Sequence, residues 1–311
     1  MLNCSCGLHT NRQVEGDPTR TKVIRDRFQG EVSKRFRKVR GDIRRAIIEQ
    51  DVFALKGIKI QNTASPNQFD FPTSEAKVQA FMDWLRELED EQILEVRERN
   101  DQGRIAERNA WERKYIRSAY QQGIERGRQE LRNAGYDVPT LAGSGGLQAV
   151  FNQDFHADRV GLLYTRAFNE LKGITDAMDQ QISRVLSRGL AEGKNPRDLA
   201  RWLNRTISGP YGDLGIVDEL GRAIPAEQRA EMLARTEVVR AHHQATINEY
   251  KTAGVKGVRV KAEWSTAGDA RVCPICAELE GQVFNIDEIE SMIPRHPRCR
   301  CAAIPAGVGE D

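Results

Sequence analysis

The chain has 311 residues, of which 6% are aromatic and 30% are charged, and its formal net charge is +2. This length allows two or three domains with cores of their own, and the composition is typical of extended helical proteins rather than compact β proteins. The nearly neutral total charge argues against a dedicated nucleic-acid-binding protein.

The sequence also argues against membrane insertion and secretion. No stretch of about 18 apolar residues occurs, and the N-terminus lacks the charged and apolar regions of a signal peptide. We therefore expect a protein without a membrane span that stays in a reducing compartment. There, its six cysteines favour metal ligation or free thiols over disulfides.

The first predicted element is an amphipathic helix over residues 20–51, whose apolar residues recur every three or four positions between Ile24 and Ile47. Residues 20–45 hold eleven basic and three acidic side chains, whereas residues 75–99 hold eight acidic and four basic ones. The basic face of this helix is a candidate contact with DNA phosphates, lipid headgroups or an acidic protein surface, and the alternative is a solvated face. It carries Arg35, Arg37, Lys38, Arg44 and Arg45.

Loops and further helices follow along the first half of the chain. Residues 56–73 lack helical periodicity and are predicted to form a loop or a short hairpin. A helix is expected to begin at Thr73 or Ser74, because a hydroxyl there can accept a hydrogen bond from a first-turn amide. Another helix is expected over residues 105–133 and ends at Gly135 in a left-handed cap.

The second half is predicted to be helical until its last part. Residues 137–147 combine Pro with clustered Gly and indicate a linker. Helices are expected over residues 159–190, after the cap Asn195–Pro196, and from Pro225 to Gly254. Beyond Gly254, apolar and charged residues alternate over 258–264, as a half-buried strand requires.

The two helices that flank Asn195–Pro196 resemble a helix-turn-helix in outline. The second of them offers Arg197 and Arg201 but no cluster of base-reading side chains. We therefore expect an ordinary helical hairpin.

These elements predict a mainly α fold with a small α+β C-terminal module, in which long amphipathic helices precede a strand-containing, zinc-knuckle-like Cys/His domain. Five segments are expected. They are a mobile N-terminal segment (1–19), a helical region with the basic first helix (20–136), the Gly/Pro linker (137–147), a helical domain (148–254) and the Cys/His module (255–311).

The strongest chemical pattern lies near the end of the sequence. A Cys-x-x-Cys pair is followed twenty residues later by three more nitrogen or sulfur donors. Zn²⁺ prefers four such ligands in a tetrahedron, so a structural zinc is predicted on four of five residues. The candidates are Cys273, Cys276, His296, Cys299 and Cys301. Disulfides, a redox couple and packed free thiols are the alternatives, although a thioredoxin-like couple needs a βαβ setting that the surroundings do not suggest.

Other potential sites are weaker. Cys4, Cys6 and His9 resemble a chelating tip, but two cysteines cannot close a tetrahedral shell alone. His242 and His243 are adjacent, hence about 100° apart around a helix, and do not form the i, i+4 pair that binds a metal. A ββα-metal nuclease is a further alternative for the terminal module, with Asp269 and Glu278 as the available carboxylates, but these donors are too few for a catalytic cation site.

Several motifs, read together, resemble the Mu F-like minor head protein (head morphogenesis) family of tailed bacteriophages over roughly residues 155–305. The motifs are Ala234–Val238, the strand that ends in Trp264, Thr266, Asp269, Arg271–Cys276, Leu279–Gly281 and His296–Cys301. The matching motif residues outside the cysteine cluster are Arg235, Glu237, Trp264, Asp269 and Arg271.

The resemblance implies a non-enzymatic virion protein that acts in head morphogenesis and in DNA packaging or delivery. It implies that the protein lies in the inner head or portal region of the virion and is in the host cytoplasm during assembly. Its implied partners are the portal or major capsid protein and, as a further option, packaged DNA, with several copies in each particle. Family members can carry toxin or enzyme domains beyond this module, but the sequence ends ten residues after Cys301, so we expect none. The rival interpretations are the nuclease and a cellular zinc-module adaptor.

Overall fold

The computed structural model describes residues 17–55, 73–99, 105–108, 111–209, 216–217, 223–254 and 260–306. Helices account for most of these residues, and the strands are short. The predicted fold class, mainly α with a small α+β module near the C-terminus, is confirmed. Across the part of the chain that is described, no helix combines the length and the apolar composition needed to cross a membrane.

The chain forms two compact units, each assembled from segments that are distant in the sequence. Unit 1 comprises Met1–Phe28, Glu112–Ala167 and Met232–Asp311, and unit 2 comprises Gln29–Trp111 and Phe168–Glu231. Three of the four boundaries fall within long helices, α1 (Lys22–Arg44), α5 (Asp154–Ala191) and α7 (Ala226–Gly254), and the fourth lies between Trp111 and Glu112.

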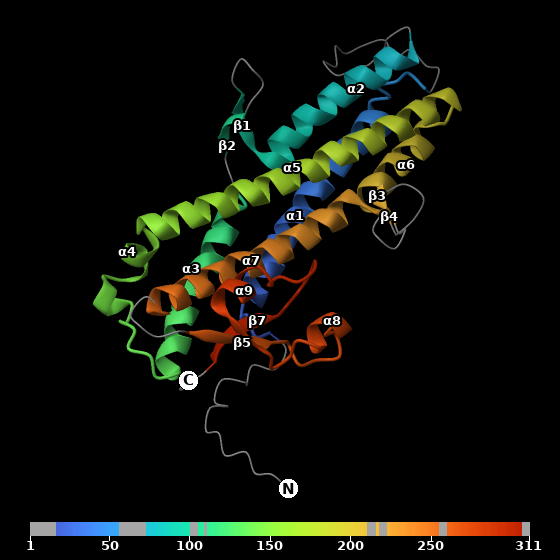
Figure 1. Ribbon diagram of the computed structural model, residues 1–311. Helices are drawn as coiled ribbons and strands as arrows, with labels where there is room; N and C mark the ends of the chain where they lie inside the picture. Colours follow the sequence, from blue (N-terminus) through green and yellow to red (C-terminus); the bar gives the residue numbers. More distant parts are fainter. Residues whose placement is uncertain are drawn as a thin grey trace. The chain divides into compact units, whose positions relative to one another are not determined.

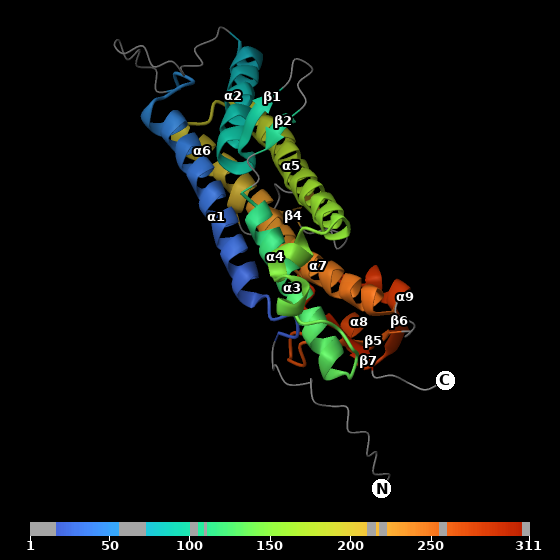
Figure 2. The same cartoon turned by 90° about the vertical axis from the view of Figure 1, so that its left-hand side faces the viewer.

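Unit 2 is built from helices and two small antiparallel hairpins (Figures 1 and 2). Besides its parts of α1 and α5, it contains a π-helical turn after α1 (Arg45–Glu49), α2 (Ser74–Glu89), a second π-helical turn (Asp90–Leu94), β1 (Val96–Arg99), β2 (Ile105–Arg108), α6 (Pro196–Ser208), β3 (Ile216–Val217) and β4 (Ala223–Ile224). Its core contains Phe36, Ile43, Phe81, Leu85 and Ile93, all of them fully buried.

The predicted helix starts in unit 2 are confirmed. The Thr73 hydroxyl accepts a hydrogen bond from the Ala76 amide at 3.2 Å and caps α2. The Asn195 side chain accepts one from the Asp198 amide at 3.0 Å, directly before Pro196. Both caps satisfy an amide that has no partner within the first helical turn.

The helix expected over residues 105–133 begins later than predicted. Residues 105–108 form β2 and pair antiparallel with β1, whereas α3 runs Arg113–Asn133. The ladder hydrogen bonds to β1 satisfy the backbone here, and such pairing overrides a weak local helical preference. The helix end is as predicted, because Gly135 adopts the left-handed conformation (φ +90°). Most of the loop expected over 56–73 lies outside the described residues.

Unit 1 joins helices to the predicted C-terminal module. Its elements are the first part of α1, α3, a 3-10 turn (Ala142–Ser144), α4 (Leu147–Phe151), the first part of α5, most of α7, β5 (Lys261–Ser265), α8 (Pro274–Ala277), β6 (Val283–Asn285), α9 (Ile286–Glu290) and β7 (Ala302–Ala306). The three strands form one antiparallel sheet in the order β6-β5-β7. Figure 1 shows this sheet beside the ends of α3 and α7.

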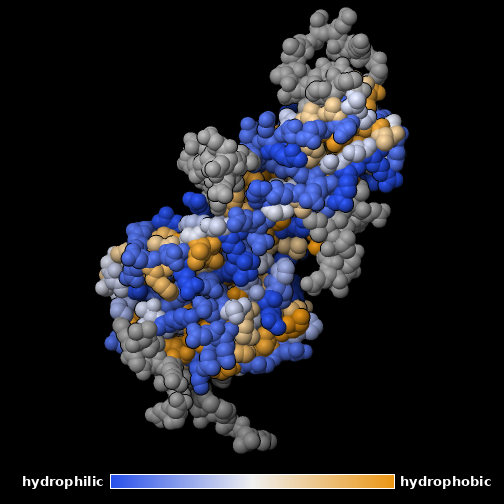
Figure 3. Space-filling view, turned by 45° about the horizontal axis from the view of Figure 1, so that its top comes forward, coloured by the Kyte–Doolittle hydropathy of each residue, from blue (hydrophilic) through white to orange (hydrophobic). Residues whose placement is uncertain are grey.

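The alternation of apolar and charged residues predicted over 258–264 is confirmed where these residues form β5. Ala262 and Trp264 are fully buried, whereas Lys261 is exposed and Glu263 is half-buried. Trp264 belongs to a core that also contains Tyr250, Ile289 and Ile293, so the strand packs against α7 and the residues around α9. On the face seen in Figure 3, hydrophilic residues predominate, as expected for amphipathic helices.

Two glycines allow α3 and α7 to pack closely within unit 1. A Cβ at Gly123 would lie 2.3 Å from the His242 carbonyl oxygen, and a Cβ at Gly127 would lie 3.0 Å from the Glu249 Cβ. Thr246 donates a hydrogen bond from its hydroxyl to the Gly123 carbonyl at 3.3 Å. Any larger residue at position 123 would therefore collide with the α7 backbone.

The boundaries between the two compact units do not lie at the linker expected over residues 137–147. Residues 137–147 lie inside unit 1 together with segments from both sides of them. Val138 packs against the unit 1 core, and Arg128 donates a hydrogen bond to the Ser144 hydroxyl at 2.8 Å. Pro and Gly therefore mark a turn-rich connection between α3 and α4, not a boundary between the compact units. The sequence could not show this, because each unit combines segments from different parts of the chain.

Candidate metal centre

The Cys-x-x-Cys pair lies at the start of the short helix α8. Cys273 is the N-cap residue, and its sulfur accepts a hydrogen bond from the Cys276 amide at 3.4 Å. Pro274 occupies the first helical turn, where a missing N–H costs nothing. This local geometry turns both sulfur atoms toward the same point.

His296 completes this side of the cluster. Its Nε2 atom lies 3.2 Å from the sulfur atoms of both Cys273 and Cys276. Its Nδ1 atom lies 2.8 Å from the Pro297 carbonyl oxygen. A carbonyl can only accept, so Nδ1 carries the proton and Nε2 presents its lone pair to the two sulfurs. The same arrangement orients histidines in known metal sites.

The five predicted ligands come together in two overlapping groups. Cys273, Cys276 and His296 have donor atoms within 4.8 Å of one another, and so do Cys276, Cys299 and Cys301. Cys276 belongs to both groups. With Zn–S and Zn–N bonds of about 2.3 and 2.0 Å, a tetrahedral site separates its donor atoms by about 3.6–3.8 Å. Each group offers three donors, so one tetrahedral ion would take its fourth ligand from the other group.

The remaining two cysteines are buried, and each of the four cysteines in the module is free of a disulfide. The Cys301 thiol donates a hydrogen bond to Cys299 and lowers the pKa of Cys299 to about 5. The same bond raises the pKa of Cys301, while burial raises the pKa of Cys276 to about 12. Such a cluster of crowded thiols shares protons, which a coordinating cation would displace.

The motif residues around the cluster fix its loops. Asp269 accepts two hydrogen bonds from Arg300, at 2.6 and 2.7 Å, and one from Arg271 Nη2 at 2.9 Å. These bonds, chiefly those from Arg300, hold the pKa of Asp269 below its usual range. The turn that precedes Cys273 is thereby tied to the segment that carries Cys299 and Cys301.

The Ala234–Val238 motif supports the same module from α7. The Thr236 hydroxyl accepts a hydrogen bond from the Arg298 amide at 3.1 Å, which ties the His296–Cys301 loop to the helix. Glu237 is buried and accepts hydrogen bonds from Arg166 and Arg240. Arg235 contacts Asp26 at 3.7 Å. These motif residues therefore have structural contacts within unit 1.

Most of the predicted basic contact residues are exposed, but Arg35 is not. Arg37, Lys38, Arg44 and Arg45 are exposed on α1 and the following turn. The Arg35 side chain is 13% exposed, donates to Glu95 and to the Gln92 carbonyl, and stacks over Trp111 at 4.1 Å. Its inclusion in an exposed contact face was wrong, because helical spacing alone did not reveal these partners in unit 2.

The alternative nuclease site has no support in the module. Asp269 is held by two guanidinium groups, and Glu278 lies in neither potential ligand group found among the described residues. His242 and His243 are buried on α7 and lie in neither group. Burial lowers the pKa of His243 to about 4, and its Nε2 lies 3.0 Å from the Ile289 carbonyl oxygen. Cys4, Cys6 and His9 lie outside the described residues.

One buried polar network in unit 1 was not foreseen. Tyr120 lies 3.1 Å from His156 Nδ1 and accepts a hydrogen bond from Asn248. Glu249 accepts one from Arg128 at 2.8 Å and lies 3.4 Å from His156 Nε2. No sequence motif links these residues, because they come from α3, α5 and α7.

Comparisons with known proteins bear on this module. Residues 180–304 match the family model described as Phage Mu protein F like protein. The chain is also 26% identical over 142 residues to the NAD(+)--arginine ADP-ribosyltransferase EFV of Enterococcus faecalis (strain ATCC 700802 / V583). That alignment covers 42% of this chain and 26% of the relative, so the chain spans about a quarter of the relative's length. No solved structure matches the chain. The resemblance to Mu F-like proteins is thus confirmed for residues 180–304.

Proposed function

We propose that this chain is a minor head protein of a tailed bacteriophage, with a structural role in head morphogenesis and in DNA packaging or delivery. The observation that carries the proposal is the Mu F-like match of residues 180–304, which includes the whole described Cys/His cluster. In this role, the protein is part of the virion, at the inner head or the portal, and is present in the host cytoplasm during assembly. Its partners are the portal or the major capsid protein, and several copies enter each particle.

Within that role, the Cys/His cluster is a structural zinc site. The donor atoms have the chemistry of a thiolate–imidazole site, and each of the two overlapping groups brings three of them within 4.8 Å of one another. The Pro297 carbonyl presets the histidine tautomer, and the Asp269–Arg300 pair fixes the loop beside it. The ion would replace the protons now shared among the thiols and would hold α8 to the His296–Cys301 loop. We assign it no catalytic role, since every ligand position can be filled by protein.

The name of the E. faecalis relative raises the possibility of an ADP-ribosyltransferase. We propose instead that the shared segment is the head-associated module, because the alignment covers only 26% of that relative. Incubation of the purified chain with labelled NAD⁺ and an arginine-rich protein tests this choice. We expect no transfer of label, and arginine-linked label on the acceptor protein would contradict the proposal.

Particle composition tests the proposal most simply. In the phage that encodes this chain, we expect mass spectrometry to detect it in gradient-purified, DNA-filled heads together with the portal protein. Deletion of its gene should leave capsid shells that package or deliver DNA poorly. Absence of the chain from purified heads and from their DNA-free precursors would contradict a head role, and a cellular zinc-module adaptor would then be the better interpretation.

A further inference from the structure

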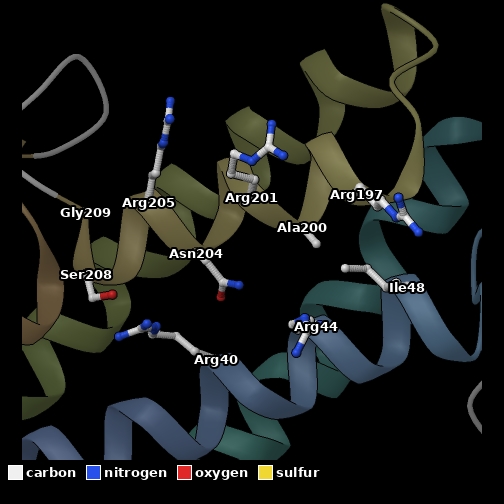
Figure 4. A pocket seen from close by; sticks show the side chains of 10 residues that line it. All are labelled: Arg40, Arg44, Ile48, Arg197, Ala200, Arg201, Asn204, Arg205, Ser208 and Gly209. Carbon is white, nitrogen blue, oxygen red and sulfur yellow. The ribbon is translucent and has the colours of Figure 1, made fainter.

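An arginine-lined groove runs between α1 and α6 within unit 2. It has a volume of about 570 Å³ and is lined by Arg40, Arg44, Ile48, Arg197, Ala200, Arg201, Asn204, Arg205, Ser208 and Gly209. Figure 4 shows Asn204 on α6 pointing toward Arg40 and Arg44 on α1, whereas Arg201 and Arg205 extend from α6 away from α1. No carboxylate is among the described residues that line this groove.

The arginines form two regular rows. Arg197, Arg201 and Arg205 follow one another at four-residue intervals along α6, and Arg40 and Arg44 do the same along α1. Residues spaced by four share one helix face, and each interval advances about 6 Å along the axis. The rows therefore present guanidinium groups repeatedly along the groove and along the outer side of α6, which suits a polymer with regularly spaced charges better than a single small anion.

The positive charge of the groove is only partly compensated within the chain. Arg201 pairs with Asp198 at 2.8 Å, and Arg40 pairs with the half-buried Glu227 at 3.1 Å. Arg44, Arg197 and Arg205 are exposed, and none of them forms an ion pair within the described part of the chain. Like charges brought together in this way repel one another, so an anionic partner would stabilise the arrangement.

We propose that this groove binds the phosphate backbone of duplex DNA without reading its sequence. Arginine forks match phosphate oxygens in bidentate geometry. Exposed arginines on long, flexible side chains can follow phosphates of any sequence, and the described lining residues include no aromatic ring for the stacking that single strands need. The inference goes beyond the proposed head role, because it assigns a specific DNA-binding surface. Three of its five arginines come from α6, the helix that the sequence marks as an ordinary hairpin.

Salt-dependent binding separates this groove from the other basic surface of the same unit. The probe is a fluorescent 30-base-pair duplex, titrated with full-length protein at a series of KCl concentrations. The groove variant is Arg197→Ala with Arg205→Ala, and the matched control is Lys34→Ala with Lys38→Ala, on a face of α1 away from Arg40 and Arg44. Both variants remove two exposed positive charges from helices of unit 2.

The wild-type affinity should fall linearly with salt on a logarithmic scale, with a slope of about −0.9 for each phosphate neutralised. The groove variant should bind more weakly to every duplex sequence and reduce the magnitude of the slope by about 2. The control should keep the wild-type slope, and circular dichroism melting should show that both variants are folded.

Three outcomes would overturn the proposal. One is absence of duplex binding at low salt, and another is loss of binding in the control but not in the groove variant. The third is stronger binding of polyglutamate than of DNA at equal ionic strength, with loss in the groove variant, which would assign the groove to an acidic protein segment. Each result is independent of the head role, because it needs only the purified chain.

Discussion

The C-terminal module of unit 1 and unit 2 differ in how their cores are built. Unit 2 buries large side chains such as Phe36, Phe81 and Leu85 completely. The module is made of three strands of three to five residues, and four cysteines occupy positions in or against its core. Small segments of this kind commonly depend on a metal or cross-links. Apolar burial thus holds unit 2, and we propose that chelation adds to the smaller core of the module.

The largest expected effect is that of removing the Cys-x-x-Cys pair. Cys273→Ser with Cys276→Ser should abolish zinc binding and unfold the module, since structural zinc contributes about 10–16 kcal/mol in small zinc-binding peptides. Hydrogen exchange should lose protection over residues 260–306, while residues 29–55 and 73–94 keep theirs. Cys4→Ser with Cys6→Ser is the control and should retain zinc. Unchanged protection of the module in Cys273→Ser with Cys276→Ser would show that the module does not depend on a metal.

Truncation of the unit 2 core should give the opposite pattern. Phe81→Ala removes a fully buried ring that packs against Phe53 at 5.4 Å between centroids. We expect a loss of about 3–5 kcal/mol in the free energy of unfolding, measured by urea denaturation, with no change in bound zinc. The control Phe155→Ala removes a ring that is 45% exposed and should change this free energy by less than about 0.5 kcal/mol. Loss of zinc on Phe81→Ala would show that the two regions are not independent.

A smaller effect is expected from changing the close packing of α3 against α7 within unit 1. Gly123→Ala places a Cβ against the α7 backbone and should lower the free energy of unfolding by about 1–3 kcal/mol. Gly161→Ala, on an open face of α5, should instead raise it by about 0.5–1 kcal/mol. Both changes are measured by urea denaturation with zinc present. A stabilising Gly123→Ala would contradict the close contact between α3 and α7.

Local chemistry in the sequence predicted much of this fold. The hydroxyl of Thr73 and the Asn195–Pro196 pair mark helix starts, Gly135 marks a helix end, and the alternation before Trp264 marks a strand. The five Cys/His residues were predicted to come together because donor type and spacing are themselves the signal. Each of these features depends on residues that are close in sequence or chemically distinctive.

Contacts between distant segments could not be predicted in the same way. The partners of Arg35 lie some sixty residues away, and the Tyr120–His156–Glu249 network joins three helices. The arginine groove combines α1 with α6, and its arginines become a surface only when those helices pack together. The division into two discontinuous units has the same origin.

The metal content of the freshly purified chain tests the central claim most directly. Elemental analysis by inductively coupled plasma mass spectrometry should find about one zinc ion per chain, bound by thiolate and imidazole ligands. Replacement by Co²⁺ should give the visible absorption of a tetrahedral thiolate site, and both signals should disappear in Cys273→Ser with Cys276→Ser. A chain without bound metal whose module nonetheless remains protected from hydrogen exchange would contradict the account.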